Sequence, residues 1–154
     1  MRQASQVEVN CEAIVHLCGL LLPGMIAAKH GSIINVASTA AFQPIPQFAT
    51  YAASKSFVLS FTRALWAETN GTGVRATAIC PGPTETGFFD AAGVPRMGAG
   101  ARRNPDDVVH TAFDALAHYR PYAVDGFINR TVARLVPHLP ARLVMARAEK
   151  YLQA

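Results

Sequence analysis

The strongest constraint on the fold is an alternation of short β-branched runs with longer helical segments. Residues 32–37 (SIINVA) and 74–79 (VRATAI) are short, apolar and bounded by glycine, serine or proline, as is typical of strands in a parallel sheet. Apolar residues at helical spacing predict helices over 5–29 and 50–70, and a Pro-Asp-Asp start predicts another over 106–118. The alternation predicts an α/β fold, with a parallel sheet covered by helices on both faces.

Further expectations concern burial and the end of the chain. Apolar residues cover most of the surface of segment 5–29, so this helix should be well buried. The strand over 32–37 should be buried on both faces. Residues 84–103 are rich in glycine and alanine without clear periodicity, which predicts a mobile loop, and residues 122–128 could form a short final strand.

Length and composition favour one globular domain over residues 1–154, because 51% of the residues are hydrophobic and only 16% are charged. No apolar stretch reaches the roughly 18 uninterrupted residues of a membrane span, and the best candidate, 13–28, is broken by His16, Pro23 and Gly24. The N-terminus has no apolar run followed by a small-residue cleavage site, so we expect a cytoplasmic location.

The cysteines and histidines do not have the spacing of metal ligands. Cys11, Cys18 and Cys80 lack the close pairs of a zinc site, and buried free thiols are the favoured interpretation. The five histidines have no mutual ligand spacing, so no metal site is expected.

The excess positive charge lies in the tail. Residues 120–154 carry six Arg or Lys against Asp125 and Glu149, interleaved with apolar residues, which makes a basic amphipathic extension. It could be a lid over a hydrophobic substrate, a contact with an anionic membrane surface, or a solvated helix that closes the domain, and the last is favoured. No motif supports nucleic-acid binding.

Tyr51 and Lys55 place a phenol and an ammonium one helical turn apart. The cation and the helix N-terminus would lower the pKa of Tyr51, and a phenol shifted in this way can act as a general acid or base. Ser38, at the end of a strand, can hydrogen-bond a substrate oxygen. Taken alone, the Tyr-x-x-x-Lys spacing is common, and an ordinary surface pair on a helix has the same pattern.

The surrounding spacing is more specific. Asn10 lies 28 residues before Ser38, which lies 13 before Tyr51, and the strings GSIINVAS, YAASKSFVLSFTRALWAE and GVRATAICPGPTET follow in order. From about Val7 to Thr86 the chain closely resembles the second half of the short-chain dehydrogenase/reductase family. This resemblance implies hydride transfer between NAD(H) or NADP(H) and the carbonyl/alcohol pair of a small molecule.

The resemblance also implies a role for each matching residue. Tyr51 would exchange a proton with the substrate oxygen, Lys55 would lower the pKa of the tyrosine and bind the nicotinamide ribose, and Ser38 would orient the carbonyl. Asn10 would hold a water in the proton relay. The turn that would meet the nicotinamide contains four matching residues: Pro81, Gly82, Thr84 and Thr86.

The family's Gly-rich phosphate-binding turn has no counterpart in this chain. In the family strand order 3-2-1-4-5-6-7, the chain would supply a partial Rossmann-like doubly wound sheet of the last three strands. Strand 32–37 would then expose an edge. The alternative is a truncated, non-catalytic fragment that only associates, since helices matching 5–29 and 50–70 form dimer interfaces in the family. The Gly-x-x-Asn-Arg string at 126–130 resembles a subset that acts on hydrophobic ketones and acyl chains.

Overall fold

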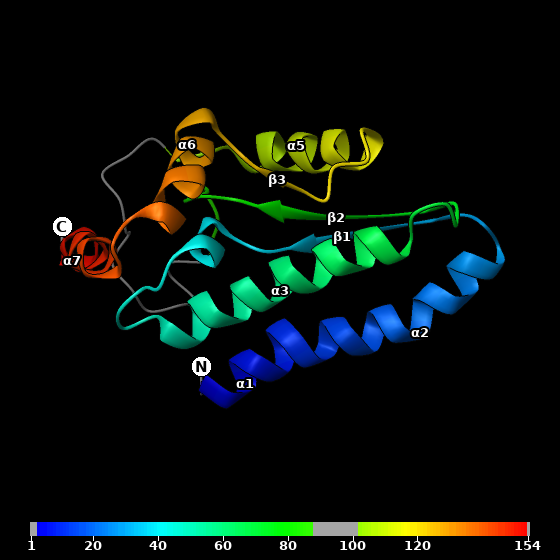
Figure 1. Cartoon of the computed structure of the whole chain (residues 1–154), viewed down its shortest axis with the longest axis horizontal. Helices are drawn as coiled ribbons and strands as arrows, with labels where there is room; N and C mark the ends of the chain where they lie inside the picture. The colour runs from blue at the N-terminus through cyan, green and yellow to red at the C-terminus, as the bar shows by residue number, and fades with distance from the viewer. Residues whose placement is uncertain (1–2, 88–101, 154) are drawn as a thin grey trace.

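The computed structural model describes residues 3–87 and 102–153 (Figure 1). In chain order the elements are the helices and strands α1 (Gln3–Val7), a π-helical turn (Glu8–Glu12), α2 (Ala13–Ala27), β1 (Gly31–Val36), a 3-10 turn (Thr39–Phe42), α3 (Ala49–Glu68), β2 (Val74–Cys80), α5 (Pro105–Ala117), β3 (Tyr122–Val124), α6 (Phe127–Leu135), a 3-10 turn (Val136–His138) and α7 (Ala141–Gln153). The predicted helices and strands are confirmed, apart from differences at their ends.

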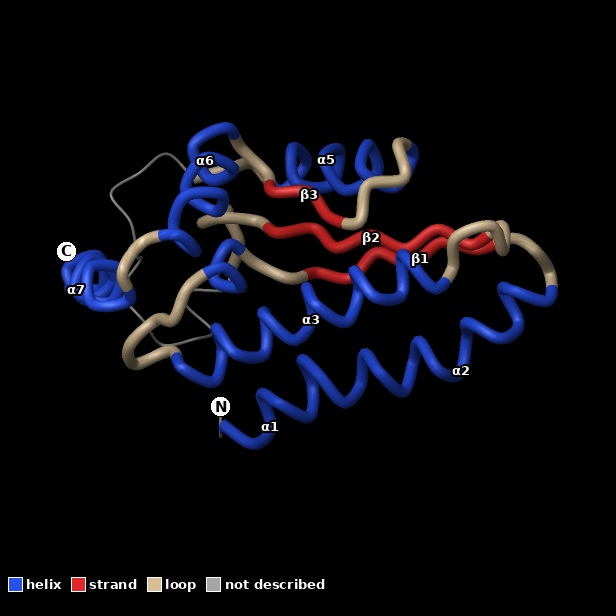
Figure 2. Tube along the Cα trace, viewed as in Figure 1, coloured by secondary structure: helices blue, strands red, loops and turns tan. Residues whose placement is uncertain are grey.

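Within the described residues, the strands form one parallel sheet in the order β1-β2-β3 (Figure 2). The register pairs Gly31 with Val74 and Val36 with Ile79 along β1 and β2. This is the arrangement that the sequence predicts for the last three strands of a doubly wound sheet.

Helices cover both faces of the sheet. Alternate residues of β2 point toward opposite faces, so each face can pack against a different helix. On one face Ala78 and Cys80 pack against Val58 and Leu59 of α3. On the other, Ile79 packs in a small cluster with two alanines of α5 and with Ala123 of β3. The predicted α/β layering is therefore confirmed.

The expected burial of segment 5–29 is wrong. Of its described residues only Cys18 is buried, and Leu20 is 77% exposed. One side of α2 packs on Ile33 and Leu65, but none of the described residues buries the apolar side chains of the other side. By length and composition alone, the continuous helical segment Gln3–Ala27 is apolar enough to cross a membrane, although His16, Pro23 and Gly24 interrupt its apolar run.

The first strand is the edge of the described sheet. Ile33 is buried, but Val36 is 54% exposed, so the expectation of burial on both faces is wrong. β1 pairs with β2 on one side only, and on the face that carries Val36 the neighbouring Ile34 is itself only partly buried against the α5 cluster. The exposed edge that the sequence predicts is present.

Two boundaries near the C-terminal half also differ from expectation. The final strand ends at Val124, because Gly126 adopts a φ of +82° and turns the chain into α6. Most of the predicted loop, residues 88–101, lies outside the described residues. Its two ends meet in a parallel bridge between Thr84 and Arg103.

Thr77 gives a stability prediction. Its side chain is fully buried in β2, and its hydroxyl has no hydrogen-bond partner among the described residues. An unsatisfied buried hydroxyl costs about 1–3 kcal/mol, so we expect Thr77→Val to raise the free energy of unfolding by about 1 kcal/mol in urea titrations.

Thr62 is the matched control, because it is equally buried but satisfied. Its hydroxyl donates to the Val58 carbonyl at 2.7 Å and accepts from Asn35 Nδ2 at 2.9 Å. Thr62→Val should therefore lower the free energy of unfolding, since it leaves the Asn35 amide without its acceptor. Equal effects of the two substitutions would contradict this explanation.

Candidate active site

The candidate site lies where the carboxyl ends of β1 and β2 meet the first turns of α3. Ser38 follows β1 and caps the 3-10 turn, where its hydroxyl oxygen accepts from the Ala40 amide at 3.1 Å. The same hydroxyl donates toward the Pro81 carbonyl at 3.5 Å, and the Thr39 amide donates to that carbonyl at 2.9 Å. These bonds join the two strand ends.

Tyr51, in the first turn of α3, is half-buried and hydrogen-bonds through its side chain to Ser38. Burial raises the pKa of Tyr51 above its ordinary value, and the hydrogen bond with Ser38 offsets only part of this effect. The expected lowered pKa is therefore wrong for the chain as described. The phenol is protonated at neutral pH, which is the form that donates a proton.

Lys55 lies one turn further along α3. Its ammonium donates to the Val36 carbonyl at 2.9 Å and stands 5.8 Å from the centre of the Tyr51 ring. Burial lowers the pKa of Lys55. The lysine is thus held by the end of β1, above the ring of the tyrosine.

Asn10 reaches the site through an intermediate residue. Its side-chain amide donates to the Ser54 hydroxyl at 3.0 Å, and that hydroxyl donates to the Tyr51 carbonyl at 2.8 Å. Asn10 lies in the π-helical turn Glu8–Glu12, which interrupts an otherwise regular helix. Such turns are frequent at functional sites, and no sequence pattern predicts this one.

The turn after β2 contains the four residues that match the nicotinamide contact of the family. Pro81 is held by Ser38 and Thr39 as described above, and the Thr84 hydroxyl donates to the Gly82 carbonyl at 2.9 Å. The Thr86 amide donates to the Thr84 carbonyl, also at 2.9 Å. The turn therefore lies beside Ser38, at the end of the sheet where ligands of such folds bind.

The structure thus brings together Ser38, Tyr51, Lys55 and Pro81, with Asn10 connected through Ser54. Ser54, which links Asn10 to the backbone of Tyr51, is buried. Thr84 and Thr86 lie in the same turn, where the Thr84 hydroxyl bonds to Gly82 and the Thr86 amide bonds to Thr84. A protonated phenol beside a hydroxyl and an ammonium is an arrangement that can donate a proton to a carbonyl oxygen and stabilise the charge left behind.

Comparison with known proteins decides the family. The family model described as "short chain dehydrogenase" matches residues 3–94, which include every candidate site residue. The chain belongs to the short-chain dehydrogenase family. The apolar segment Gln3–Ala27 lies inside the matched region.

Relatives in sequence match only part of this chain. An uncharacterized oxidoreductase of Staphylococcus saprophyticus is 34% identical over 112 residues, which is 73% of this chain and 47% of the relative. The NADP-dependent 3-hydroxy acid dehydrogenase of Escherichia coli is 38% identical over 78 residues, 51% of this chain and 32% of the enzyme. The chain thus spans half or less of the length of these curated relatives.

Solved structures confirm the partial Rossmann-like fold. A short chain dehydrogenase from Burkholderia cenocepacia in complex with NADP aligns with a TM-score of 0.77 at 24% identity, over 96% of this chain and 59% of that one. A 7beta-hydroxysteroid dehydrogenase has the same TM-score and identity, over 93% of this chain and 56% of that one. At this identity the likeness concerns the fold.

Proposed function

We propose that this chain is the catalytic part of an NAD(P)-dependent oxidoreductase that interconverts a carbonyl and a secondary alcohol in the cytoplasm. The observation that carries the proposal is the meeting of Ser38, Tyr51 and Lys55 where β1 ends, with the Lys55 ammonium 2.9 Å from the Val36 carbonyl and 5.8 Å from the centre of the tyrosine ring. The NADP-dependent relative in Escherichia coli and the NADP complex in Burkholderia cenocepacia support the choice of cofactor class.

The residues present fit the nicotinamide half of such a cofactor. Lys55 would hold the ribose hydroxyls and Tyr51 would lie beside them. The Pro81–Thr86 turn would face the carboxamide with backbone groups that are already fixed by Ser38 and Thr39. The described residues include no Gly-rich turn for the phosphates, so this part of the site would have to come from sequence outside this chain.

The protein's contribution to the reaction follows from these positions. A bound nicotinamide supplies or accepts the hydride. Ser38 donates a hydrogen bond to the carbonyl oxygen and fixes its orientation. Tyr51 Oη gives its proton to that oxygen as negative charge develops there, and the Lys55 ammonium stabilises the phenolate that remains. Asn10, through Ser54, holds the backbone of Tyr51 in place.

A reductase assay tests the proposal. The chain would be joined behind the N-terminal half of the Burkholderia cenocepacia dehydrogenase, whose structure contains NADP. We expect consumption of NADPH or NADH that depends on an added ketone, with hydrophobic ketones favoured because of the apolar residues of the amphipathic tail. No ketone-dependent consumption in a folded, nucleotide-binding chimera would contradict the proposal.

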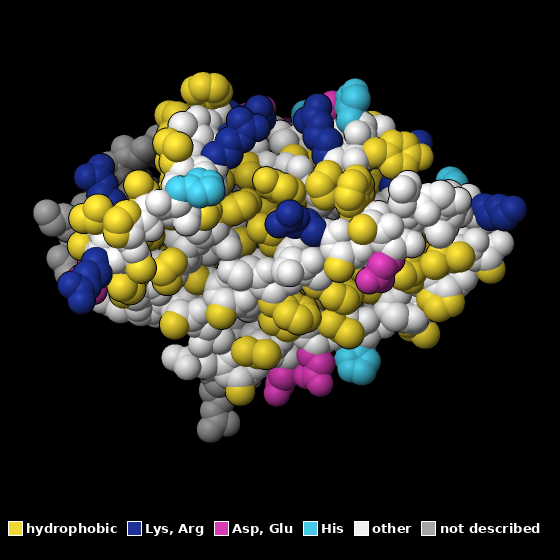
Figure 3. Space-filling model, viewed as in Figure 1, with side chains coloured by type: hydrophobic (Ala, Val, Ile, Leu, Met, Phe, Trp, Pro, Cys, Tyr) yellow, Lys and Arg dark blue, Asp and Glu magenta, His cyan; other side chains and the backbone are white. Residues whose placement is uncertain are grey.

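A second candidate function is self-association without catalysis, through α2 and α3. Exposed apolar side chains gather along these helices, in the lower part of the view in Figure 3. Those on the segment Gln3–Ala27 are Val7, Val9, Val15, Leu17, Leu20, Leu21 and Ile26. An apolar surface of this extent favours a protein partner, and a second copy of the chain is the partner that the family resemblance implies.

Leu20→Glu tests this association. Leu20 is 77% exposed, and in a symmetric dimer the substitution would introduce two buried charges. We expect it to weaken the dimer by more than about tenfold in sedimentation equilibrium. Phe113→Glu is the control, because Phe113 is 61% exposed on α5, across the sheet, and should leave association unchanged. A wild-type chain that is monomeric at high concentration would rule out the association.

A further inference from the structure

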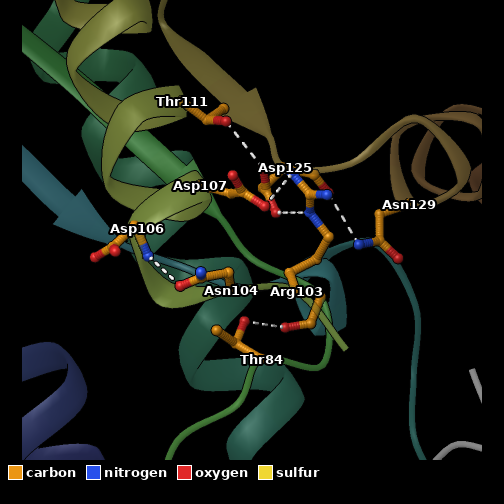
Figure 4. Close-up of polar contacts among 9 residues, drawn as sticks. Thr84, Arg103, Asn104, Asp106, Asp107, Thr111, Asp125 and Asn129 are labelled. Atoms are coloured by element: carbon orange, nitrogen blue, oxygen red, sulfur yellow. Dashed lines mark hydrogen bonds and ion pairs between the residues drawn. The ribbon is translucent and has the colours of Figure 1, made fainter. Parts of the chain in front are cut away.

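The turn that would meet the nicotinamide is held from behind by a polar network that the catalytic residues do not explain. The network joins Arg103, Thr111, Asp125 and Asn129, which come from four separate parts of the chain (Figure 4). Asp125 is its centre, with only 1% of its surface exposed.

Arg103 connects the far side of the turn to Asp125. Its backbone amide donates to the Pro83 carbonyl at 3.0 Å, and its own carbonyl accepts from the Glu85 amide at 3.0 Å. Its guanidinium binds the Asp125 carboxylate through two hydrogen bonds, Nε to Oδ2 at 2.8 Å and Nη2 to Oδ1 at 3.2 Å. The turn is therefore tied to Asp125 by a paired, directional contact.

Asn129 supports the near side of the turn. Its side-chain amide donates to the Asp125 carbonyl at 2.9 Å and packs directly on Gly82. A Cβ on Gly82 would lie 2.7 Å from Asn129 Cγ, so a larger residue at this position would displace the Asn129 amide. This contact gives a structural meaning to the Gly-x-x-Asn-Arg string, whose glycine turns the chain and whose asparagine reaches back to the turn.

Asp125 is itself well anchored. Its backbone amide donates to the Cys80 carbonyl at 3.3 Å, just before the turn, and its carboxylate also accepts from the Thr111 hydroxyl at 2.9 Å. Although burial raises the pKa of Asp125, the hydrogen bonds from Arg103 and Thr111 hold it below its ordinary value. The carboxylate is thus charged at neutral pH, and the contact is lost only in acid, as the pH falls through this lowered pKa.

We propose that Asp125, through Arg103 and Asn129, positions the Pro81–Thr86 turn to receive the nicotinamide of the cofactor. This inference rests on the proposed function. Asp125, Arg103 and Asn129 are positioning residues, because they act through the turn and need not touch the cofactor. They hold the backbone of the turn before, beside and after Gly82, so that its amides and carbonyls are fixed in advance of binding.

Hydrogen exchange of the 154-residue chain tests the clamp without any cofactor. In Asp125→Asn, the new amide would place an N–H group against the Nε–H of Arg103. We expect the Glu85 and Arg103 amides to exchange more than about tenfold faster, while the Ala37 amide, bonded to Ile79, keeps its rate. Asn129→Ala serves as a second variant if Asp125→Asn does not fold. Unchanged rates at Glu85 and Arg103, or uniform acceleration that includes Ala37, would overturn the proposal.

The matched control is Asp107→Asn. Asp107 also pairs with Arg103, at 3.2 Å, but it is about half exposed and makes no contact with the turn in the described structure. This substitution should leave the exchange of Glu85 unchanged, since exposed ion pairs contribute little. Equal effects of Asp107→Asn and Asp125→Asn would contradict a specific clamp.

Binding of reduced nicotinamide mononucleotide, which lacks the adenosine half, separates this inference from the proposed function. We expect Asp125→Asn, but not Asp107→Asn, to weaken its binding to the chain by more than about fivefold, as measured by NMR titration. If the wild-type chain shows no nucleotide-dependent change at Tyr51 or the turn, the proposed function is wrong, and the inference fails with it. If the nucleotide binds and Asp125→Asn leaves its affinity unchanged, only the positioning role is wrong.

Discussion

Tyr51→Phe should lower the rate of ketone reduction by the chimera by about 10²–10⁴-fold, the range that positioned general acids contribute. The substitution removes one oxygen and keeps the ring that packs beneath Lys55. It deletes the proton donor and its hydrogen bond with Ser38. The effect should therefore fall on the catalytic rate at saturating substrate, with little change in the affinity for NADPH.

Tyr119→Phe is the control for this substitution. Tyr119 is 54% exposed, and its ring packs on the Arg75 guanidinium at the opposite end of β2 from the candidate site. Its phenol has no role in the proposed reaction, so the rate should stay within about twofold of the parent. Reduction that survives Tyr51→Phe at the parent rate would show that another group supplies the proton.

The pH dependence of the isolated chain follows from the raised pKa of Tyr51. Because burial favours the neutral phenol, titration of Tyr51 followed by NMR should occur above the ordinary range for tyrosine. The protonated form therefore persists through neutral pH, which suits carbonyl reduction. A bound nicotinamide cation would add positive charge next to the phenol and move this pKa downward.

Gly73→Ala should lower the free energy of unfolding by about 3 kcal/mol or more. Gly73 adopts a φ of +86° just before β2, and an added Cβ would overlap the carbonyl oxygen of Lys29. This oxygen belongs to the backbone of the connection between α2 and β1, so it cannot move aside like the end of a side chain. Relief of the overlap requires displacement of the first pair of the β1–β2 register, Gly31 with Val74.

Gly71→Ala separates strain from collision. Gly71 has a similar φ of +78°, but no atom lies within 4 Å of the position of its added Cβ. Gly71→Ala should lower the free energy of unfolding only through the left-handed backbone conformation, by about 1 kcal/mol in the same urea titrations. Similar losses for the two variants would mean that the contact with Lys29 does not set the start of the sheet.

The sequence predicts the layers of this fold well because the evidence is local. The β-branched runs and the helical spacing each reflect which faces must be buried, and a parallel order follows from their alternation. The burial of segment 5–29 could not be predicted in the same way. Apolar residues indicate that a helix surface favours burial. They do not indicate whether another segment of this chain buries it, and Leu20 is exposed in the structure.

The candidate site could also be predicted from the sequence only in part. The meeting of Ser38, Tyr51 and Pro81 could be anticipated, because they follow strand ends or begin a helix at the same edge of the sheet. The π-helical turn at Asn10 and the raised pKa of Tyr51 depend on packing, which has no local sequence signature. The pairing of Arg103 with Asp125 joins residues 22 positions apart, and only the fold reveals it.

The central claim is that Tyr51, Lys55 and the Pro81–Thr86 turn form the nicotinamide side of a dehydrogenase site. Its most direct test is an NMR titration of the isotope-labelled chain with reduced nicotinamide mononucleotide, with adenosine monophosphate as the comparison ligand. We expect weak, saturable shifts confined to Ser38, Tyr51, Lys55 and the turn, and none with adenosine monophosphate. Equal shifts with both nucleotides, or saturable shifts that avoid these residues, would contradict the account.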